Sequence, residues 1–193
     1  MSPIASTLTN TSARGYGGLG ASVTLPSDFE FIQGYLLSSN ESSVTFATIP
    51  STYRALLLRS SARTTGNQTD TFIRYNGNSS SSYASHLLTA SGSAVNPFDL
   101  TGQGQTRSAC LLTGSSQPAA TFGVGYLQIN DYASSTKLKT SKSYAGTIGP
   151  VSGGEAQWYD NLWANTSPIT SILLFPGEGL FVAGSRFNLY GVK

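Results

Sequence analysis

The order of apolar and polar positions predicts β-strands from residue 28 to the C-terminal end. Segments such as 29–37 (FEFIQGYLL) and 44–49 (VTFATI) are rich in aromatic and β-branched residues, which suit a pleated, half-buried surface. Further strands are expected at 53–59, 71–75, 83–88, 108–113, 120–132, 137–145, 157–163, 169–175 and 180–192. No window of a dozen residues places apolar side chains at helical spacing. The chain is therefore expected to be almost entirely β-stranded.

The spacing of these strands predicts the fold class. Gly, Pro, Ser and Asn separate them at short intervals, which is typical of an antiparallel sandwich or jelly roll. No linker or repeat of fixed period divides residues 28–193, so we expect one all-β domain, a two-sheet antiparallel β-sandwich of jelly-roll type. Asn76-Gly77 is the most favourable pair for a two-residue turn. The segment 83–88 would be the return strand, although the serines before it indicate a longer loop.

Residues 1–27 are rich in Gly, Ser and Thr and predict an extended N-terminal arm. Such termini fray unless contacts hold them, so we expect the arm to dock on a neighbouring protein; the alternative is that it folds back along its own sandwich. The side chains available for docking are Ile4, Leu8, Arg14, Tyr16 and Leu19. The segment GYGGLG matches a dinucleotide-binding pattern, but no strand precedes it and no helix follows. A glycine-rich arm is favoured.

Composition excludes several classes of partner. Charged residues make up only 10% of the 193 residues, against about 25% in typical domains. The net charge of +2 comes from scattered residues, so we expect no basic face and no nucleic-acid partner. No segment reaches the roughly 18 apolar residues of a membrane helix, and the N-terminal residues lack the pattern of a signal peptide. We therefore expect no membrane partner.

Residues that could support catalysis or metal binding are few. Cys110 is the only cysteine and is expected to be a buried small hydrophobe. His86 is the only histidine, so neither a metal site of soft ligands nor a Ser–His pair has support, and we interpret it as structural. Glu155 and Asp160 resemble a glycosidase pair in type only, because five positions along a strand put them on opposite faces. We predict no catalytic residue, metal, cofactor or enzymatic activity.

One aromatic group is a candidate contact surface. Trp158, Tyr159 and Trp163 lie close together in sequence, beside Asp160 and Asn161. Trp and Tyr next to such polar residues are frequent in patches that contact sugars or proteins. The alternative is that one or two of the three fill the core of the sandwich.

Three segments carry motifs that a known family shares. Residues 44–59 (VTFATIPSTYRALLLR) are similar to I-T-F-x-x-I-P-x-T-Y-x-x-L-x-L-R, and they continue through Arg63 to IRYNG at 73–77, similar to L-R-F-N-G-D with Asn78 in place of Asp. Residues 131–140 (DYASSTKLKT) are similar to D-Y-A-S-T-x-K-x-K-T. The segments 163–172 and 184–193 are similar to W-x-x-T-x-x-I-T-S-I and G-S-x-F-x-L-Y-G-I-K. Together they resemble small structural proteins of tailed bacteriophages, notably those of marine bacteria and cyanobacteria.

The resemblance covers about residues 30–193 and implies a virion component without catalytic residues. We expect a non-enzymatic protein on the particle surface, made in the bacterial cytoplasm and docked by its arm to the major capsid protein or to tail proteins. Capsid decoration or cementing is the first expectation, and a homo-oligomer, a trimer first, is expected by analogy with viral jelly rolls. The alternative is a tail-fibre or tail-tip adhesin that binds host surface glycans.

Overall fold

The computed structural model describes residues 28–67, 70–92, 94–147 and 154–193. Within these ranges the chain forms twelve strands and no helix, which confirms the all-β prediction. The docking residues expected in the arm, namely Ile4, Leu8, Arg14, Tyr16 and Leu19, lie outside the described residues, as does the side chain of Cys110.

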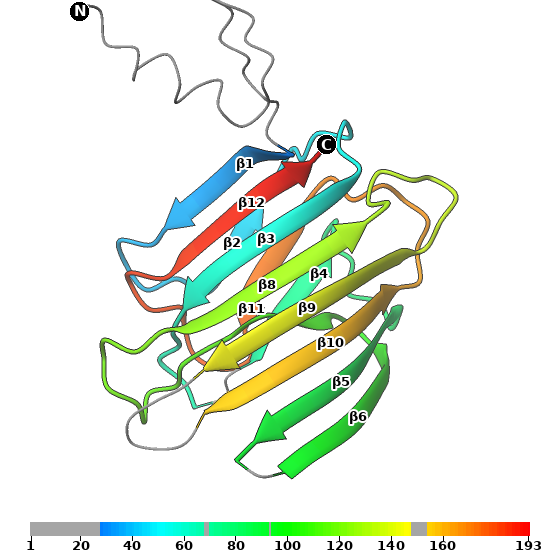
Figure 1. Ribbon diagram of the computed structural model, residues 1–193. Coiled ribbons are helices and arrows are strands. Elements are labelled where there is room, and N and C mark those ends of the chain that lie inside the picture. Colours follow the sequence, from blue (N-terminus) through cyan, green and yellow to red (C-terminus); the bar gives the residue numbers. More distant parts are fainter. Residues whose placement is uncertain (1–27, 68–69, 93, 148–153) are drawn as a thin grey trace, which may run out of the picture.

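The strands form two antiparallel sheets that face each other (Figure 1). In chain order they are β1 (Phe29–Leu36), β2 (Val44–Phe46), β3 (Ala55–Ala62), β4 (Asp70–Tyr75), β5 (Tyr83–Ser91), β6 (Ala94–Gln103), β7 (Thr106–Leu111), β8 (Gly123–Asn130), β9 (Lys139–Thr147), β10 (Glu155–Trp163), β11 (Ile172–Pro176) and β12 (Arg186–Val192). The large sheet has eight strands in the order β1-β12-β3-β8-β9-β10-β5-β6. The small sheet has four, in the order β2-β11-β4-β7.

This strand order is that of a jelly roll with two inserted strand pairs. Four nested antiparallel pairs join early strands to late ones: β1 with β12, β2 with β11, β3 with β8, and β4 with β7. Pairing of β12 with β3 and of β11 with β4 completes two four-stranded sheets, the arrangement of a jelly roll. The pairs β5–β6 and β9–β10 extend one of these sheets beyond β8. The predicted jelly-roll sandwich is confirmed, with sheets of unequal width.

The core lies between the two sheets and follows the alternation of the strands. In β12, Phe187 and Leu189 are fully buried, and Asn188 between them is only partly buried. They belong to one cluster with Phe46, Ile73 and Leu174 of the small sheet. Each such side chain contributes about 1.5–3 kcal/mol through the apolar surface that it buries. The sandwich is therefore stabilised mainly by this shared apolar layer.

The sequence pattern misses β6 and extends β12 too far. All but two of the ten residues of β6 are exposed, because the strand forms the edge of the large sheet away from β1. A strand exposed on both faces has no apolar alternation to reveal it. The segment before β12 was expected to be strand from residue 180, but it makes only isolated bridges, through Phe181, to Glu41 and Thr64.

The Asn76-Gly77 turn forms but does not close a hairpin. Both residues have positive φ, 53° and 67°, and the amide of Asn78 donates to the carbonyl of Tyr75 at 2.9 Å, as a two-residue turn requires. However, β4 before the turn lies in the small sheet and β5 after it lies in the large one. The expectation that β5 pairs with β4 is wrong. The turn instead carries the chain from one sheet to the other.

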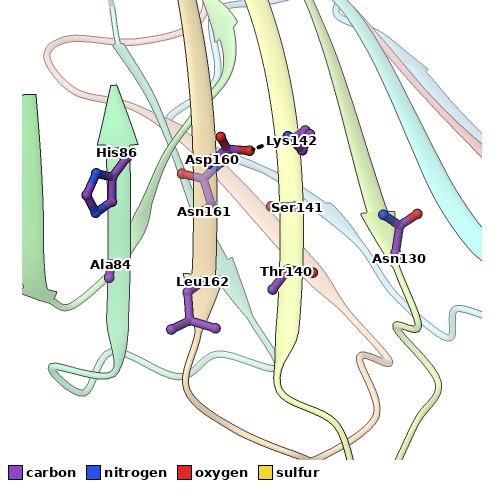
Figure 2. A pocket seen from close by; sticks show the side chains of 9 residues that line it. All are labelled: Ala84, His86, Asn130, Thr140, Ser141, Lys142, Asp160, Asn161 and Leu162. Atoms are coloured by element: carbon purple, nitrogen blue, oxygen red, sulfur yellow. Dashed lines mark ion pairs between the residues drawn. The ribbon is translucent and has the colours of Figure 1, made fainter. Parts of the chain in front are cut away.

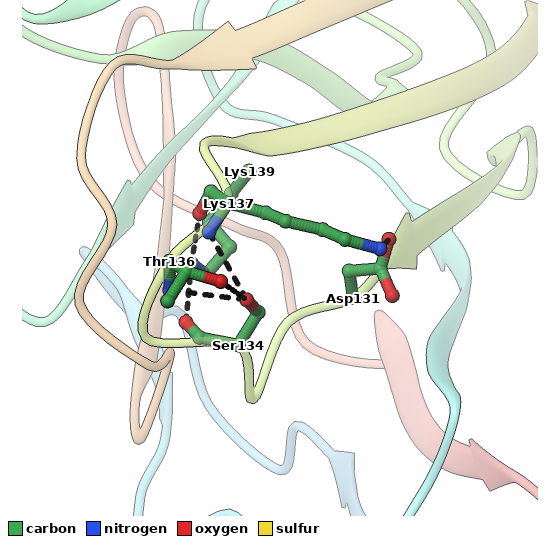
Figure 3. Close-up of polar contacts among 5 residues, drawn as sticks. All are labelled: Asp131, Ser134, Thr136, Lys137 and Lys139. Atoms are coloured by element: carbon green, nitrogen blue, oxygen red, sulfur yellow. Dashed lines mark hydrogen bonds and ion pairs between the residues drawn. The ribbon is translucent and has the colours of Figure 1, made fainter.

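A buried lysine organises the loop that contains the DYASSTKLKT motif (Figure 3). Lys139 is 1% exposed, and its ammonium donates to the carbonyls of Ser134 (2.7 Å), Lys137 (2.7 Å) and Thr166 (2.9 Å). Burial lowers its pKa. Nearer the surface, Lys137 forms an ion pair with Asp131 at 2.9 Å. The motif therefore forms a self-bonded loop that is also tied to the segment after β10.

A buried arginine does the same for the loop between β7 and β8. Arg63 is 6% exposed and follows β3 directly. Its guanidinium donates to four backbone carbonyls of this loop, those of Ser115 (3.5 Å), Gln117 (2.6 Å), Pro118 (2.8 Å) and Thr121 (3.2 Å). The planar guanidinium has five N–H donors, so this one side chain can hydrogen-bond to several residues of the loop.

Candidate functional site

The predicted aromatic group is divided between the core and the surface. Odd-numbered residues of β10 point between the sheets, so Tyr159 and Trp163 are 0% and 1% exposed. Trp163 packs on Tyr75 and Tyr83, with ring centroids 5.5 and 6.1 Å away. The hypothesis of a contact surface is therefore wrong for these two residues, and the alternative that they fill the core holds. Only Trp158, 44% exposed, is available to a partner.

Trp158 belongs to a row of apolar side chains across the outer face of the large sheet. It lies opposite Leu88 of β5 and Tyr144 of β9, and Tyr144 lies opposite Tyr126 of β8. The ring centroids of Trp158 and Tyr144 are 4.8 Å apart, and those of Tyr144 and Tyr126 are 6.2 Å apart. We call Leu88, Trp158, Tyr144 and Tyr126 the outer aromatic row.

A second row, parallel to the first, is polar. Asp160 follows Trp158 on the same face of β10 and lies opposite His86 of β5 and Lys142 of β9. The Lys142 ammonium is 3.1 Å from Asp160 Oδ1, and His86 Nε2 is 3.6 Å from Oδ1 of Asp99 on β6. All four side chains are more than half exposed. With Gln128 of β8, opposite Lys142, they form the outer polar row.

The polar row borders an open hollow of about 500 Å³ (Figure 2). The hollow spans β5, β10, β9 and the end of β8 and is lined by Ala84, His86, Asn130, Thr140, Ser141, Lys142, Asp160, Asn161 and Leu162. Ala84 and Thr140 are short, which leaves space between the longer polar side chains. A second hollow of about 280 Å³ lies toward β6, where Leu88, Pro97, Phe98 and Trp158 make it apolar. His86 and Asp160 line both hollows.

The candidate carboxylates point to opposite sides of the large sheet, as the sequence predicts. Glu155 lies on the inner side, where its Oε1 accepts hydrogen bonds from Thr89 Oγ1 at 2.5 Å and from Gln157 Nε2 at 2.9 Å. Asp160 lies on the outer side. His86 is exposed on β5, so it contributes to the outer face and not to the core. Glu155 and Asp160 therefore do not face a common substrate.

The described part of the chain offers no group of three or more His, Cys, Asp and Glu side chains placed to hold a metal ion. Within the same residues, no helix is long and apolar enough to span a membrane. Comparison of the chain with protein-family models, curated proteins and solved structures finds no match. The chemistry of the outer face therefore has to be inferred from its own side chains. These side chains are donors, acceptors and aromatic rings open to solvent, which suits binding.

Proposed function

We propose that the protein is a non-enzymatic structural component on the surface of a tailed-phage particle, with capsid decoration or cementing as its first role. The observation that carries this proposal is where the phage-like motifs lie in the fold. Segment 44–59 supplies Phe46 and Leu58 of the core, and segment 184–193 supplies Phe187 and Leu189. Segment 131–140 supplies the buried Lys139. The resemblance thus rests on residues that build a scaffold, not on a reactive site.

The jelly roll adds support, because this architecture is frequent in viral capsid proteins. Fold by itself does not establish function, and here it only agrees with the motifs. The low content of charged residues agrees as well, since packing against other subunits then desolvates few charges. Self-association into a trimer is part of this proposal. Light scattering on the purified protein tests it, and a monomer at all concentrations would count against it.

The route of the chain into the domain suits an arm that docks elsewhere. Residue 28 leads directly into β1, an edge strand of the large sheet, beside the C-terminal strand (Figure 1). The amide of Lys193 donates to the carbonyl of Asp28 at 3.0 Å. Phe29, Phe31 and Leu36 of β1 are 46%, 58% and 62% exposed, so the strand that follows the arm offers apolar surface to a neighbour.

Deletion of residues 2–20 tests the docking role of the arm. The truncated protein should remain a soluble β-domain by circular dichroism, because the core cluster seen in the described residues is built entirely from positions after 28. It should fail to join particles that lack the native protein, whereas full-length protein added in parallel should restore its copy number. If the truncated protein joins at the full-length copy number, or does not fold, the arm is not a docking element.

A second function has one specific observation in its favour. The outer aromatic row beside the outer polar row is the combination expected of a surface that contacts sugars. It favours a tail-fibre or tail-tip adhesin that binds host surface glycans. The two functions differ in copy number and location, since a decoration protein covers the head and an adhesin is confined to the tail.

A further inference from the structure

We propose that the outer face of the large sheet, between the outer aromatic row and the 500 Å³ hollow, binds a neutral oligosaccharide. The inference deepens the adhesin candidate, but it does not depend on where on a particle the protein is located. It rests on three observations about the same face: an exposed stacking ring, polar groups at the right spacing, and no excess of positive charge.

The stacking ring is the indole of Trp158. Its side chain is 44% exposed and is supported by Tyr144, whose ring centroid lies 4.8 Å away. A pyranose has faces of C–H groups and edges of hydroxyls, so it packs on an indole through one face while the hydroxyls remain available. Large, rigid aromatic side chains provide such contact area at little entropic cost. Trp158 therefore supplies the apolar half of a sugar site.

The polar half of the proposed sugar site lies two residues further along β10. Trp158 and Asp160 are two residues apart on the outer face of β10, which separates their Cα atoms by about 7 Å. This is close to the width of one sugar ring, so a pyranose on Trp158 directs its hydroxyls toward Asp160 and Lys142. The carboxylate accepts hydrogen bonds and the ammonium donates them, and the two are already aligned 3.1 Å apart. Charge-assisted hydrogen bonds of this kind are among the stronger ones.

The charge of the site identifies a neutral ligand. Lys142 is balanced by Asp160, and Asp99 adds a further carboxylate beside His86, so the face has no excess of positive charge. Polyanions such as nucleic acids or sulfated glycans need such an excess. A neutral polyol, in contrast, uses donors and acceptors together. The paired charges are thus complementary to hydroxyl groups and not to phosphate, sulfate or carboxylate.

The open shape of the site suits an extended oligosaccharide and not a small compact molecule. Pockets for small ligands usually enclose most of the ligand surface, whereas this hollow is open along four strands. Asn130 of β8 lines the end of the hollow opposite His86 of β5 (Figure 2). An oligosaccharide that crosses the strands obliquely would place one sugar ring on Trp158 and further sugar rings along the polar row. Several weak contacts along one chain suit such an open surface.

Tryptophan fluorescence tests the proposal directly, because the chain has only two tryptophans and Trp163 is buried. Purified full-length protein is titrated with neutral oligomers of glucose, mannose and N-acetylglucosamine, and with oligogalacturonate as the acidic control. We expect at least one neutral oligomer to give a saturable blue shift and to protect the protein from acrylamide quenching. Oligogalacturonate should have no effect. Saturation-transfer NMR provides a second readout.

Four variants make the result specific. Trp158→Ala should abolish binding, and Asp160→Asn should weaken it about tenfold, the loss of one charge-assisted hydrogen bond. Trp158→Phe should keep binding by NMR while losing the fluorescence response, which guards against misfolding of the alanine variant. Phe31→Ala, an exposed aromatic on β1 of the same sheet, should bind as the native protein does. The proposal is overturned if no neutral oligomer binds, if the acidic oligomer binds better, or if Trp158→Ala binds normally.

This test is independent of the proposed particle role. A purified protein that binds no sugar would still be able to decorate a capsid, and a sugar-binding protein that is absent from particles would contradict the particle role alone.

Discussion

Single buried cations stabilise loops whose own residues offer few apolar contacts. The loops are rich in Ser, Thr and Gly, which offer few apolar contacts. Lys139 and Arg63 replace those contacts by gathering backbone carbonyls around a buried cation, three around the ammonium and four around the guanidinium. Neither cation is within 4.0 Å of a carboxylate in the described part of the chain. Buried charges are tolerated only where such hydrogen bonds replace water.

Replacing Lys139 by Met should lower the free energy of unfolding by about 3 kcal/mol, because three backbone carbonyls lose a charged donor. Urea denaturation followed by fluorescence measures this change. Lys137→Met is the matched control, since Lys137 is 63% exposed in its ion pair with Asp131 and surface pairs contribute at most about 1 kcal/mol. Equal losses in the two variants would show that the carbonyl contacts of Lys139 have no special role.

The turn between β4 and β5, which links the two sheets, is held in place by side-chain hydrogen bonds. Asn76 accepts hydrogen bonds at Oδ1 from the amides of Thr170 (2.8 Å) and Ser171 (3.1 Å), and its Nδ2 donates to the carbonyl of Pro168 (2.8 Å). These contacts join the end of β4 to the segment that leads into β11, its partner in the small sheet. The Asn76 side chain thus holds the end of β4 against the segment that precedes β11.

Asn76→Ala should lower the free energy of unfolding by about 2–3 kcal/mol, as measured by thermal or urea denaturation. It removes three hydrogen bonds that the Asn76 side chain accepts and one that it donates, and it puts alanine at a positive φ of 53°, which only Gly, Asn and Asp adopt readily. Asn96→Ala on the exposed strand β6 should change stability by less than about 0.5 kcal/mol. A loss at position 76 no larger than at position 96 would contradict the role of the turn.

Some of the strands can be predicted from the sequence alone, and others cannot. Strands with one buried face, such as β12 with Phe187 and Leu189, were found because their alternation is visible. β6 was missed because it has no buried face. The outer rows could not be predicted, since they depend on the register that puts Trp158 opposite Tyr144 and Asp160 opposite Lys142. Register is set by long-range pairing, which a single sequence does not display.

For the molecule as a whole, the inserted pairs β5–β6 and β9–β10 explain both the wide outer face and the aromatic interior behind it. They double the width of one jelly-roll sheet from four strands to eight. Trp163 of β10 and Tyr83 of β5 then pack against Tyr75 of the small sheet. The insertions therefore create a surface on one side and are anchored by buried aromatic rings on the other.

These buried rings should make the protein sensitive to alkali. Burial raises the pKa of Tyr75 and of Tyr83 above the ordinary value of 10.0. The unfolded chain releases these protons near its ordinary pKa while the folded chain keeps them, so stability is complete below about pH 10 and falls as the pH rises above it. A tyrosinate absorbance titration should show a late group of tyrosines that ionises together with unfolding.

Tyr75→Phe should shrink that late phase by one tyrosine. If all tyrosines ionise in a single early step while circular dichroism remains native, the aromatic interior is not closed to solvent as described.

The proposed role of this jelly roll is as a component of the surface of a tailed-phage particle. A cryo-electron microscopy reconstruction of purified particles, with the copy number of the chain from a quantitative gel of the same sample, tests it most directly. We predict jelly-roll density in a regular lattice on the head, in hundreds of copies, with continuous density from the start of β1 to the neighbouring capsid protein. A few copies at the tail would favour the adhesin instead. Absence of the chain from purified particles would contradict the claim.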